Sequence, residues 1–80
     1  MDIEVRLADG STDTFRDTVW DGHVPYDYAV HRYEVLSDDA LVVYRGDYRG
    51  YGETDPQHLR GEERVGYYRP QQWTSVRRPV

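Results

Sequence analysis

An 80-residue chain has room for one small domain with one hydrophobic core, because a chain this short buries only about 60% of the surface that its unfolded form exposes. A hydrophobic content of 38% and eight tyrosines argue against intrinsic disorder. Cysteine and lysine are both absent, which excludes disulfides, thiolate metal sites and a lysine-bearing phosphate loop. The net charge is −5: residues 1–40 hold ten acids and three arginines (−7), and residues 41–80 hold five acids and seven arginines (+2).

The chain contains no apolar run approaching the roughly 20 residues that cross a bilayer. Its first ten residues, MDIEVRLADG, lack the basic and then apolar layout of a secretion signal. We therefore expect a cytoplasmic protein with no membrane partner. We expect one β domain over residues 1–80, with residues 77–80 as a frayed C-terminal tail.

The first predicted element is a hairpin, because IEVRL alternates apolar and polar residues and is followed by the turn sequence ADGS. A two-residue loop would place Phe15 opposite Glu4. A three-residue loop with Gly10 in the left-handed conformation would instead place Phe15 on the face of Ile3 and Val5. We favour the second register because it buries the single phenylalanine.

Residues 33–45, YEVLSDDALVVYR, predict a second hairpin with Ser-Asp-Asp as its turn. The unbroken run over residues 40–44 is typical of a strand that is covered on both faces, or of a strand at the closing seam of a barrel.

Residues 64–76, RVGYYRPQQWTSV, predict a third hairpin around a turn over residues 69–72 with proline in its second position. In that register Tyr68 faces Trp73. Gly66 leaves space for a large ring to lie across the backbone.

The segments between these hairpins are predicted to be less regular. Residues 18–32 are expected to form a loop that leads into an extended segment, and residues 45–53, RGDYRGYGE, a mobile loop. Asp55 is the expected cap of one short helical turn that Gly61 ends. The predicted fold is mostly β: a single antiparallel meander or half-open barrel of five to six strands, of SH3-like size, with this one helical turn.

The sequence offers no catalytic or metal-binding pattern. The histidines His23, His31 and His58 lack the i, i+2 and i, i+4 spacings common in metal sites, and we expect them to be structural or exposed. No serine lies in a nucleophile-elbow context. We therefore expect a protein that is not an enzyme and holds neither a metal nor a cofactor.

Tyrosine, tryptophan and arginine, the residue types that dominate the energetics of protein interfaces, are concentrated in two stretches of the C-terminal half. Such residues also stack on nucleic-acid bases, but a net charge of −5 disfavours that partner. The alternative is that these rings pack inside the fold. The candidate residues for binding a protein partner are Tyr67, Tyr68, Arg69, Trp73, Arg45, Tyr48, Arg49 and Tyr51.

The segments LADGSTDTF, YEVLSDDALVVYR and YYRPQQW resemble small β-rich proteins of uncharacterised function from GC-rich actinobacteria and their phages. The resemblance covers the three hairpins, about half of the chain. It implies a compact β fold and a mobile-element origin, and it assigns no functional residue.

Three functions are compatible with these patterns. The first is a non-enzymatic protein-binding module, such as a phage or mobile-element accessory factor that uses an aromatic and arginine surface. The second is an inhibitor that mimics nucleic acid with a row of carboxylates. The third is a homo-oligomeric structural subunit, in which self-association would stabilise a modest core. The carboxylates of the second hypothesis are those of Asp9, Asp13, Asp17, Asp21 and Asp27.

Overall fold

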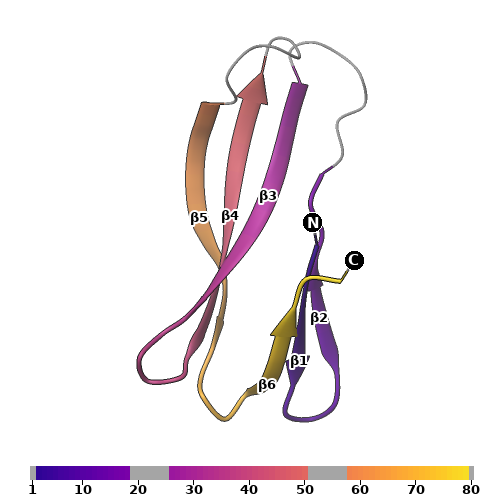
Figure 1. Ribbon diagram of the computed structural model, residues 1–80, viewed down its shortest axis with the longest axis vertical. Coiled ribbons are helices and arrows are strands. Elements are labelled where there is room, and N and C mark those ends of the chain that lie inside the picture. Colours follow the sequence, from indigo (N-terminus) through magenta and orange to yellow (C-terminus); the bar gives the residue numbers. More distant parts are fainter. Residues whose placement is uncertain (1, 19–25, 51–57, 80) are drawn as a thin grey trace.

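A computed structural model describes residues 2–18, 26–50 and 58–79 of the chain (Figure 1). The described residues form six strands and no helix, which confirms the predicted fold class. The strands are β1 (Ile3–Leu7), β2 (Thr12–Phe15), β3 (Tyr26–Val35), β4 (Leu41–Gly50), β5 (His58–Tyr68) and β6 (Trp73–Arg77).

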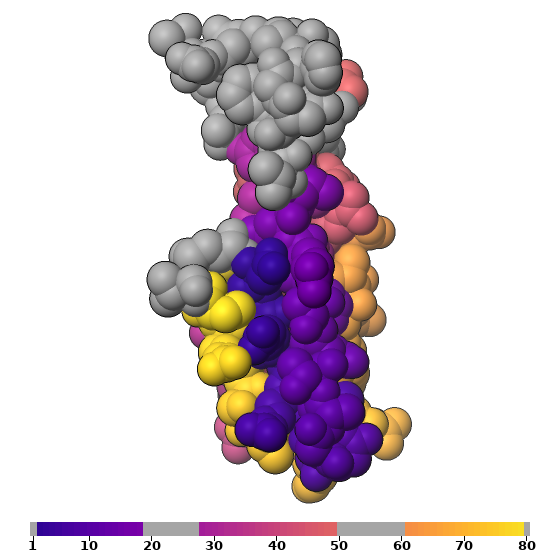
Figure 2. Space-filling model, turned by 90° about the vertical axis from the view of Figure 1, so that its right-hand side faces the viewer, coloured from indigo at the N-terminus to yellow at the C-terminus, as the bar shows by residue number. Residues whose placement is uncertain are grey.

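The strands form two antiparallel three-stranded sheets, a short sheet with the order β2-β1-β6 and a long sheet with the order β3-β4-β5. Figure 2 shows the strands of the short sheet as a layer in front of the long sheet. The chain links the two sheets at both edges of the long one: Thr18 N–H donates to the Ala29 carbonyl of β3 at 3.0 Å, and a turn carries β5 into β6. The result is a small, half-open barrel.

The N-terminal hairpin has the predicted register. Ile3 pairs with Phe15, so the phenylalanine lies on the face of Ile3 and Val5. The loop has three residues, since Leu7 N–H donates to the Ser11 carbonyl at 2.8 Å. Gly10 has a φ of 91°, the left-handed conformation that this loop type requires.

The second hairpin turns in the same way. Leu36 N–H donates to the Ala40 carbonyl at 2.8 Å, and Asp39 has a φ of 68°, at the position that Gly10 occupies in the first turn. The carboxylate of Asp38 accepts the Ala40 N–H at 3.0 Å, an Asx-type bond that holds the loop. The two sequences LADGS and LSDDA therefore encode one turn geometry.

Replacing Asp39 with glycine is expected to stabilise the protein by about 0.5 kcal/mol, because glycine adopts a positive φ without steric cost. Gly10→Ala makes the opposite change at the matching position and should destabilise by about 1 kcal/mol. Urea unfolding of the two variants beside the wild type measures both values. Equal effects of the same sign would show that the two turns are not equivalent.

The core lies between the two sheets, and its central cluster among the described residues consists of four fully buried side chains, Ile3, Val5, Leu41 and Val43. Val42 points to the other face of β4 and is only 2% exposed, so β4 has buried side chains on both faces at this position, as the apolar run in its sequence predicts. Six partly buried residues pack against this core, namely Leu7, Phe15, Tyr33, Tyr68, Trp73 and Val76.

The third hairpin was predicted wrongly. The turn itself forms, with Gln72 N–H donating to the Arg69 carbonyl at 2.9 Å, but β5 and β6 separate after it and enter different sheets. Tyr68 pairs with Leu41 of β4, and Trp73 pairs with Leu7 of β1. The physical reason is that crossing to β1 lets both rings cover the core, whereas a hairpin would stack them on each other.

Two segments predicted as irregular belong to strands. β4 continues through residues 45–50 because it pairs with β3 and β5 along this part, and these ladders override the weak β propensity of its glycines. Of the expected helical turn, residues 58–61 open β5 instead, with Gly61 paired to Asp47. The expected cap at Asp55 lies outside the described residues.

The C-terminal segment was expected to fray from residue 77 onward. β6 ends at Arg77, whose guanidinium Nε donates to a carboxylate oxygen of Glu4 at 2.9 Å. Residues 78 and 79 follow without regular structure, and the Arg78 guanidinium lies 5.7 Å from the centre of the Tyr33 ring.

Candidate functional site

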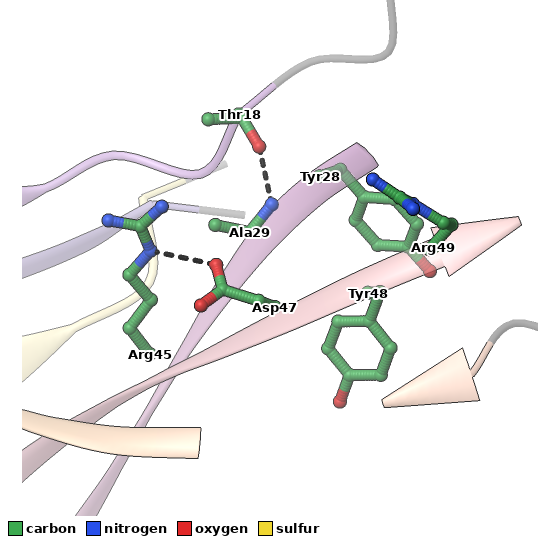
Figure 3. A pocket seen from close by; sticks show the side chains of 7 residues that line it. All are labelled: Thr18, Tyr28, Ala29, Arg45, Asp47, Tyr48 and Arg49. Carbon is green, nitrogen blue, oxygen red and sulfur yellow. Dashed lines mark hydrogen bonds and ion pairs between the residues drawn. The ribbon is translucent and has the colours of Figure 1, made fainter. Parts of the chain in front are cut away.

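Five of the eight predicted binding residues line two hollows on the surface. The first, here named the Arg45 pocket, has a volume of about 350 Å³ and lies beside β3 and β4 (Figure 3). It is lined by Thr18, Tyr28, Ala29, Arg45, Asp47, Tyr48 and Arg49. The second, here named the Tyr67 cleft, has a volume of about 470 Å³ and lies between the first turn and the end of β5 with the turn that follows it. It is lined by Leu7, Ala8, Asp9, Tyr67, Tyr68, Gln71 and Gln72.

The backbone of β4 sets the charged wall of the Arg45 pocket. Arg45, Asp47 and Arg49 alternate with other residues along the strand, so they share one face of it. Thr18 reaches the pocket from the segment after β2, because its amide bonds to the Ala29 carbonyl and its hydroxyl accepts the Ala29 N–H. Figure 3 shows the Thr18 hydroxyl directed at the Ala29 nitrogen, the linked side chains of Arg45 and Asp47 to one side, and Arg49 beside the Tyr28 ring.

Two tyrosines from neighbouring strands form the other wall. Tyr28 and Tyr48 are directly opposed in the β3–β4 register, and their rings stack with centres 5.3 Å apart and an angle of 11° between their planes. Both residues are partly exposed. Cross-strand aromatic pairs of this kind stabilise a sheet and hold each ring in one orientation.

The Arg45 pocket is rich in hydrogen-bond donors. Arg45 Nε donates to Asp47 Oδ1 at 3.1 Å, and the two side chains are 44% and 50% exposed, so this ion pair contributes little to stability. It leaves the terminal nitrogens of the Arg45 guanidinium for a ligand. Among the described residues, the lining holds two arginines and one carboxylate, in a chain whose net charge is −5.

The Tyr67 cleft has a different character, because two aromatic residues predicted there as binding residues serve the fold. Tyr68 packs on the core, and its hydroxyl donates to Asp13 Oδ2 at 2.6 Å. Trp73 also packs on the core, and its indole N–H donates to the Asp39 carbonyl at 3.0 Å. Both side chains therefore tie the turns and sheets together.

Burial of Tyr68 raises the pKa of its phenol well above the usual range, and the hydrogen bond to Asp13 raises it further. We expect this residue to stay protonated at pH values where exposed tyrosines ionise. A spectrophotometric titration of the wild type and of Tyr68→Phe tests this. The variant should lose no phenol that titrates near pH 10, and should be about 1 kcal/mol less stable. Loss of a normally titrating phenol would contradict the assignment.

The other predicted residues of the C-terminal stretch point elsewhere. Tyr67 is 49% exposed, and the Arg64 guanidinium lies 5.7 Å from its ring centre. Arg69 is exposed in the turn, where its backbone N–H donates to Gln72 Oε1 at 2.9 Å. The predicted residues thus fall into three groups. Tyr67 and Arg69 are exposed, Tyr68 and Trp73 pack on the core, and the remaining described ones line the Arg45 pocket. Tyr51 lies outside the described residues.

A buried polar pair was not predicted from the sequence. His31 is 7% exposed, and its Nδ1 lies 2.9 Å from Asp17 Oδ1. The same oxygen accepts the His31 backbone N–H at 2.8 Å, so Asp17 fixes the chain after β2 to the edge of β3. Burial tends to raise the pKa of Asp17, but the hydrogen bonds that the carboxylate accepts, including those from His31, outweigh burial and lower it.

The aspartates that were predicted to form an acidic row lie in different environments. Asp9 is exposed in the first turn, Asp13 accepts the Tyr68 hydroxyl, and Asp17 is bound to His31 with its side chain 11% exposed. The side chains of Asp21 and Asp27 lie outside the described part of the chain. Within the described part, therefore, the carboxylates at positions 9, 13 and 17 do not form one exposed surface.

Among the described residues, no three histidine, aspartate or glutamate side chains come together in a group that could hold a metal ion. A search of the same residues finds no helix with the length and apolar character needed to span a membrane. No protein-family model, curated protein or solved structure matches the chain.

Proposed function

We propose that this protein is a non-enzymatic protein-binding module, and that its Arg45 pocket receives an acidic side chain, aspartate or glutamate, from the partner. The observation that carries the proposal is a concave site in which arginines and stacked tyrosines lie together on paired strands. These residue types supply most of the binding energy at protein interfaces when they are held in place beforehand.

The chemistry of the lining favours a carboxylate. The hydroxyl of Thr18 accepts the Ala29 N–H and can therefore donate its own hydrogen into the pocket. The phenol of Tyr48 and the guanidinium of Arg45 add further donors. Asp47 is the one carboxylate among the described lining residues, and Arg45 already neutralises it. A carboxylate ligand would accept from several of these donors at once.

The charge of the pocket lining also differs from the charge of the chain as a whole. A partner that presents acidic groups is repelled by most of a chain with a net charge of −5, whereas the described lining of the pocket holds more arginines than carboxylates. This difference would orient the partner as it approaches. The lining also lacks histidine, serine and cysteine among the described residues, so its side chains suit recognition better than acid–base or nucleophilic chemistry.

Peptide titration followed by amide NMR shifts tests the proposal. The probes are a blocked Leu-Glu-Leu tripeptide and the corresponding Leu-Gln-Leu tripeptide. The glutamate peptide is expected to shift the amides of residues 18, 28–29 and 45–49, and the glutamine peptide is expected to leave them largely unchanged.

Matched variants assign the effect to the pocket. Arg45→Gln should weaken the response to the glutamate peptide at least about fivefold, because it removes a charge-assisted hydrogen bond. Arg69→Gln, the same change at an exposed turn residue, should not alter it. Equal responses to the two peptides, or equal losses in the two variants, would refute an acidic ligand for this pocket.

A further inference from the structure

The long sheet has one face that no other described element covers. The short sheet packs against Leu41 and Val43 of β4, and the alternate residues of that strand face the opposite way. Figure 1 shows β1, β2 and β6 together on one side of the long sheet. We name the opposite surface the outer face. Tyr28 and Tyr48 lie on this face at the end of the sheet away from the second turn. Nearer to that turn its polar and aromatic residues are Arg32, Glu34, Tyr44, Glu62, Arg64 and Tyr67.

These side chains form an ordered network across all three strands. The guanidinium of Arg32 makes two hydrogen bonds to Glu62, at 2.6 and 3.1 Å, and lies 4.1 Å from the centre of the Tyr44 ring. Arg64 lies over Tyr67 in a similar way. Paired arginines and tyrosines lose less conformational freedom on binding than unpaired ones, because their geometry is already set.

The outer face remains accessible although it is ordered. The side chains of Arg32 and Glu34 are 49% and 53% exposed, and Tyr67 is 49% exposed. Val42 on this face is only 2% exposed, so the side chains around it already cover it. The network therefore shields the apolar part of the sheet and still presents rings and charges to solvent. Aromatic and guanidinium surfaces of this kind are typical of interface centres.

The charges of the outer face are balanced, in contrast to the rest of the molecule. Among the side chains that the structure describes on this face, two arginines balance two glutamates, whereas the whole chain has a net charge of −5. A second copy of the chain is therefore repelled when it approaches most other surfaces. It is not repelled at the outer face, where each copy offers both signs of charge to the other.

From this arrangement we propose that the outer face is the interface of a symmetric homodimer, with a second copy of this chain as its partner. A twofold interface must be self-complementary, because each residue that contacts a position on the partner receives the same contact in return. A face with equal numbers of arginines and glutamates can be self-complementary, because the arginines of one copy can meet the glutamates of the other. The partner would stack on the exposed sides of the Arg32–Tyr44 and Arg64–Tyr67 pairs.

The small core is a reason why association would stabilise this protein. In the described part of the chain the fully buried cluster has four side chains, and a domain of this size commonly depends on disulfides, a metal or association for added stability. The chain has no cysteine. Burial of the outer face against a second copy would add apolar contact without enlarging the core. The inference is independent of the Arg45 pocket and rests on different residues.

Sedimentation equilibrium and light scattering between about 2 and 500 µM test the dimer. The wild type is expected to pass from the monomer mass to twice that mass, with a dissociation constant on the order of 10 µM. Arg64→Glu changes the outer face from neutral to −2 and should raise the dissociation constant at least about tenfold. Arg69→Glu makes the same change in charge at an exposed turn and should leave the constant within about twofold.

Tyr67→Ala provides a second, uncharged variant that should also weaken the dimer, and circular dichroism verifies that each variant is folded. A wild type that stays monomeric throughout this range would overturn the proposal. An equal loss of association in Arg64→Glu and Arg69→Glu would also overturn it, because net charge rather than the outer face would then control association. The peptide titration of the Arg45 pocket can be repeated on monomeric Arg64→Glu, so the two proposals fail separately.

Discussion

Asp17→Ala is expected to lower the free energy of unfolding by about 3 kcal/mol, one of the two largest effects that we predict. The substitution leaves the ring and the backbone N–H of His31, a largely buried residue of β3, without the carboxylate that accepts them. It also releases the segment that joins the short sheet to the edge of β3. Asp17→Asn keeps one acceptor oxygen and should lose about half as much.

The control for this prediction is Asp47→Ala, which removes a carboxylate from a half-exposed ion pair and should change stability by no more than about 0.5 kcal/mol. Chemical denaturation at neutral pH measures all three variants. A loss at Asp17 no larger than that at Asp47 would show that the Asp17–His31 pair does not hold the barrel together.

The contribution of Asp17 should also depend on pH in a defined direction. Its pKa in the folded protein lies below the ordinary value of 3.8, so the carboxylate stabilises the fold fully above about pH 4. That stabilisation disappears as the pH falls through the lowered pKa. The difference in unfolding free energy between the wild type and Asp17→Ala should therefore narrow below pH 4 and not widen. A difference that grows in acid would contradict the assignment.

The second large effect is expected at Gly66. A Cβ atom at this position would lie 3.0 Å from Phe15 Cζ and 3.4 Å from both Tyr68 and Val43. Valine adds two further carbons to this crowded place, so Gly66→Val should destabilise the protein by about 2–3 kcal/mol. Gly61→Val offers a matched control, because nothing lies within 4 Å of its Cβ position and valine suits a strand. Thermal unfolding should separate the two variants clearly, and similar melting temperatures would show that the Phe15 ring does not lie against Gly66.

The local parts of the fold could be predicted from the sequence because short-range patterns determine them. The alternation of IEVRL, the Gly10 loop and the Ser-Asp-Asp turn fix two hairpin registers within about ten residues each. Gly66 was also expected to accommodate a ring, and the Phe15 ring lies there. In each case the residues that decide the conformation are close together in the sequence.

The errors arose where distant partners decide the structure. The turn over residues 69–72 forms as predicted, but its flanking strands part because β6 finds β1, almost the full length of the chain away. Residues 45–50 appear loop-like because of their glycines, and only the pairing with β3 and β5 on both sides makes them a strand. Propensity over a few residues cannot report such pairings.

The candidate site was predicted only in part for the same reason. Arg45, Tyr48 and Arg49 were selected by residue type, and Tyr28 was missed. A signal for it existed: extending the second hairpin outward from its turn places Tyr28 opposite Tyr48. Thr18 and the Asp17–His31 pair gave no such signal, because the segment that holds them reaches β3 through tertiary contacts alone.

Site-specific photo-crosslinking tests most directly whether the Arg45 pocket binds a protein partner. A benzophenone amino acid replaces Tyr48 in one sample and Tyr67 in another, and each is irradiated in an extract of the organism that encodes the chain. We expect a cross-linked protein from position 48 that is lost in Arg45→Gln, kept in Arg69→Gln, and attached through a segment rich in acidic residues. Products that form equally at positions 48 and 67, or that persist in Arg45→Gln, would contradict the proposed function.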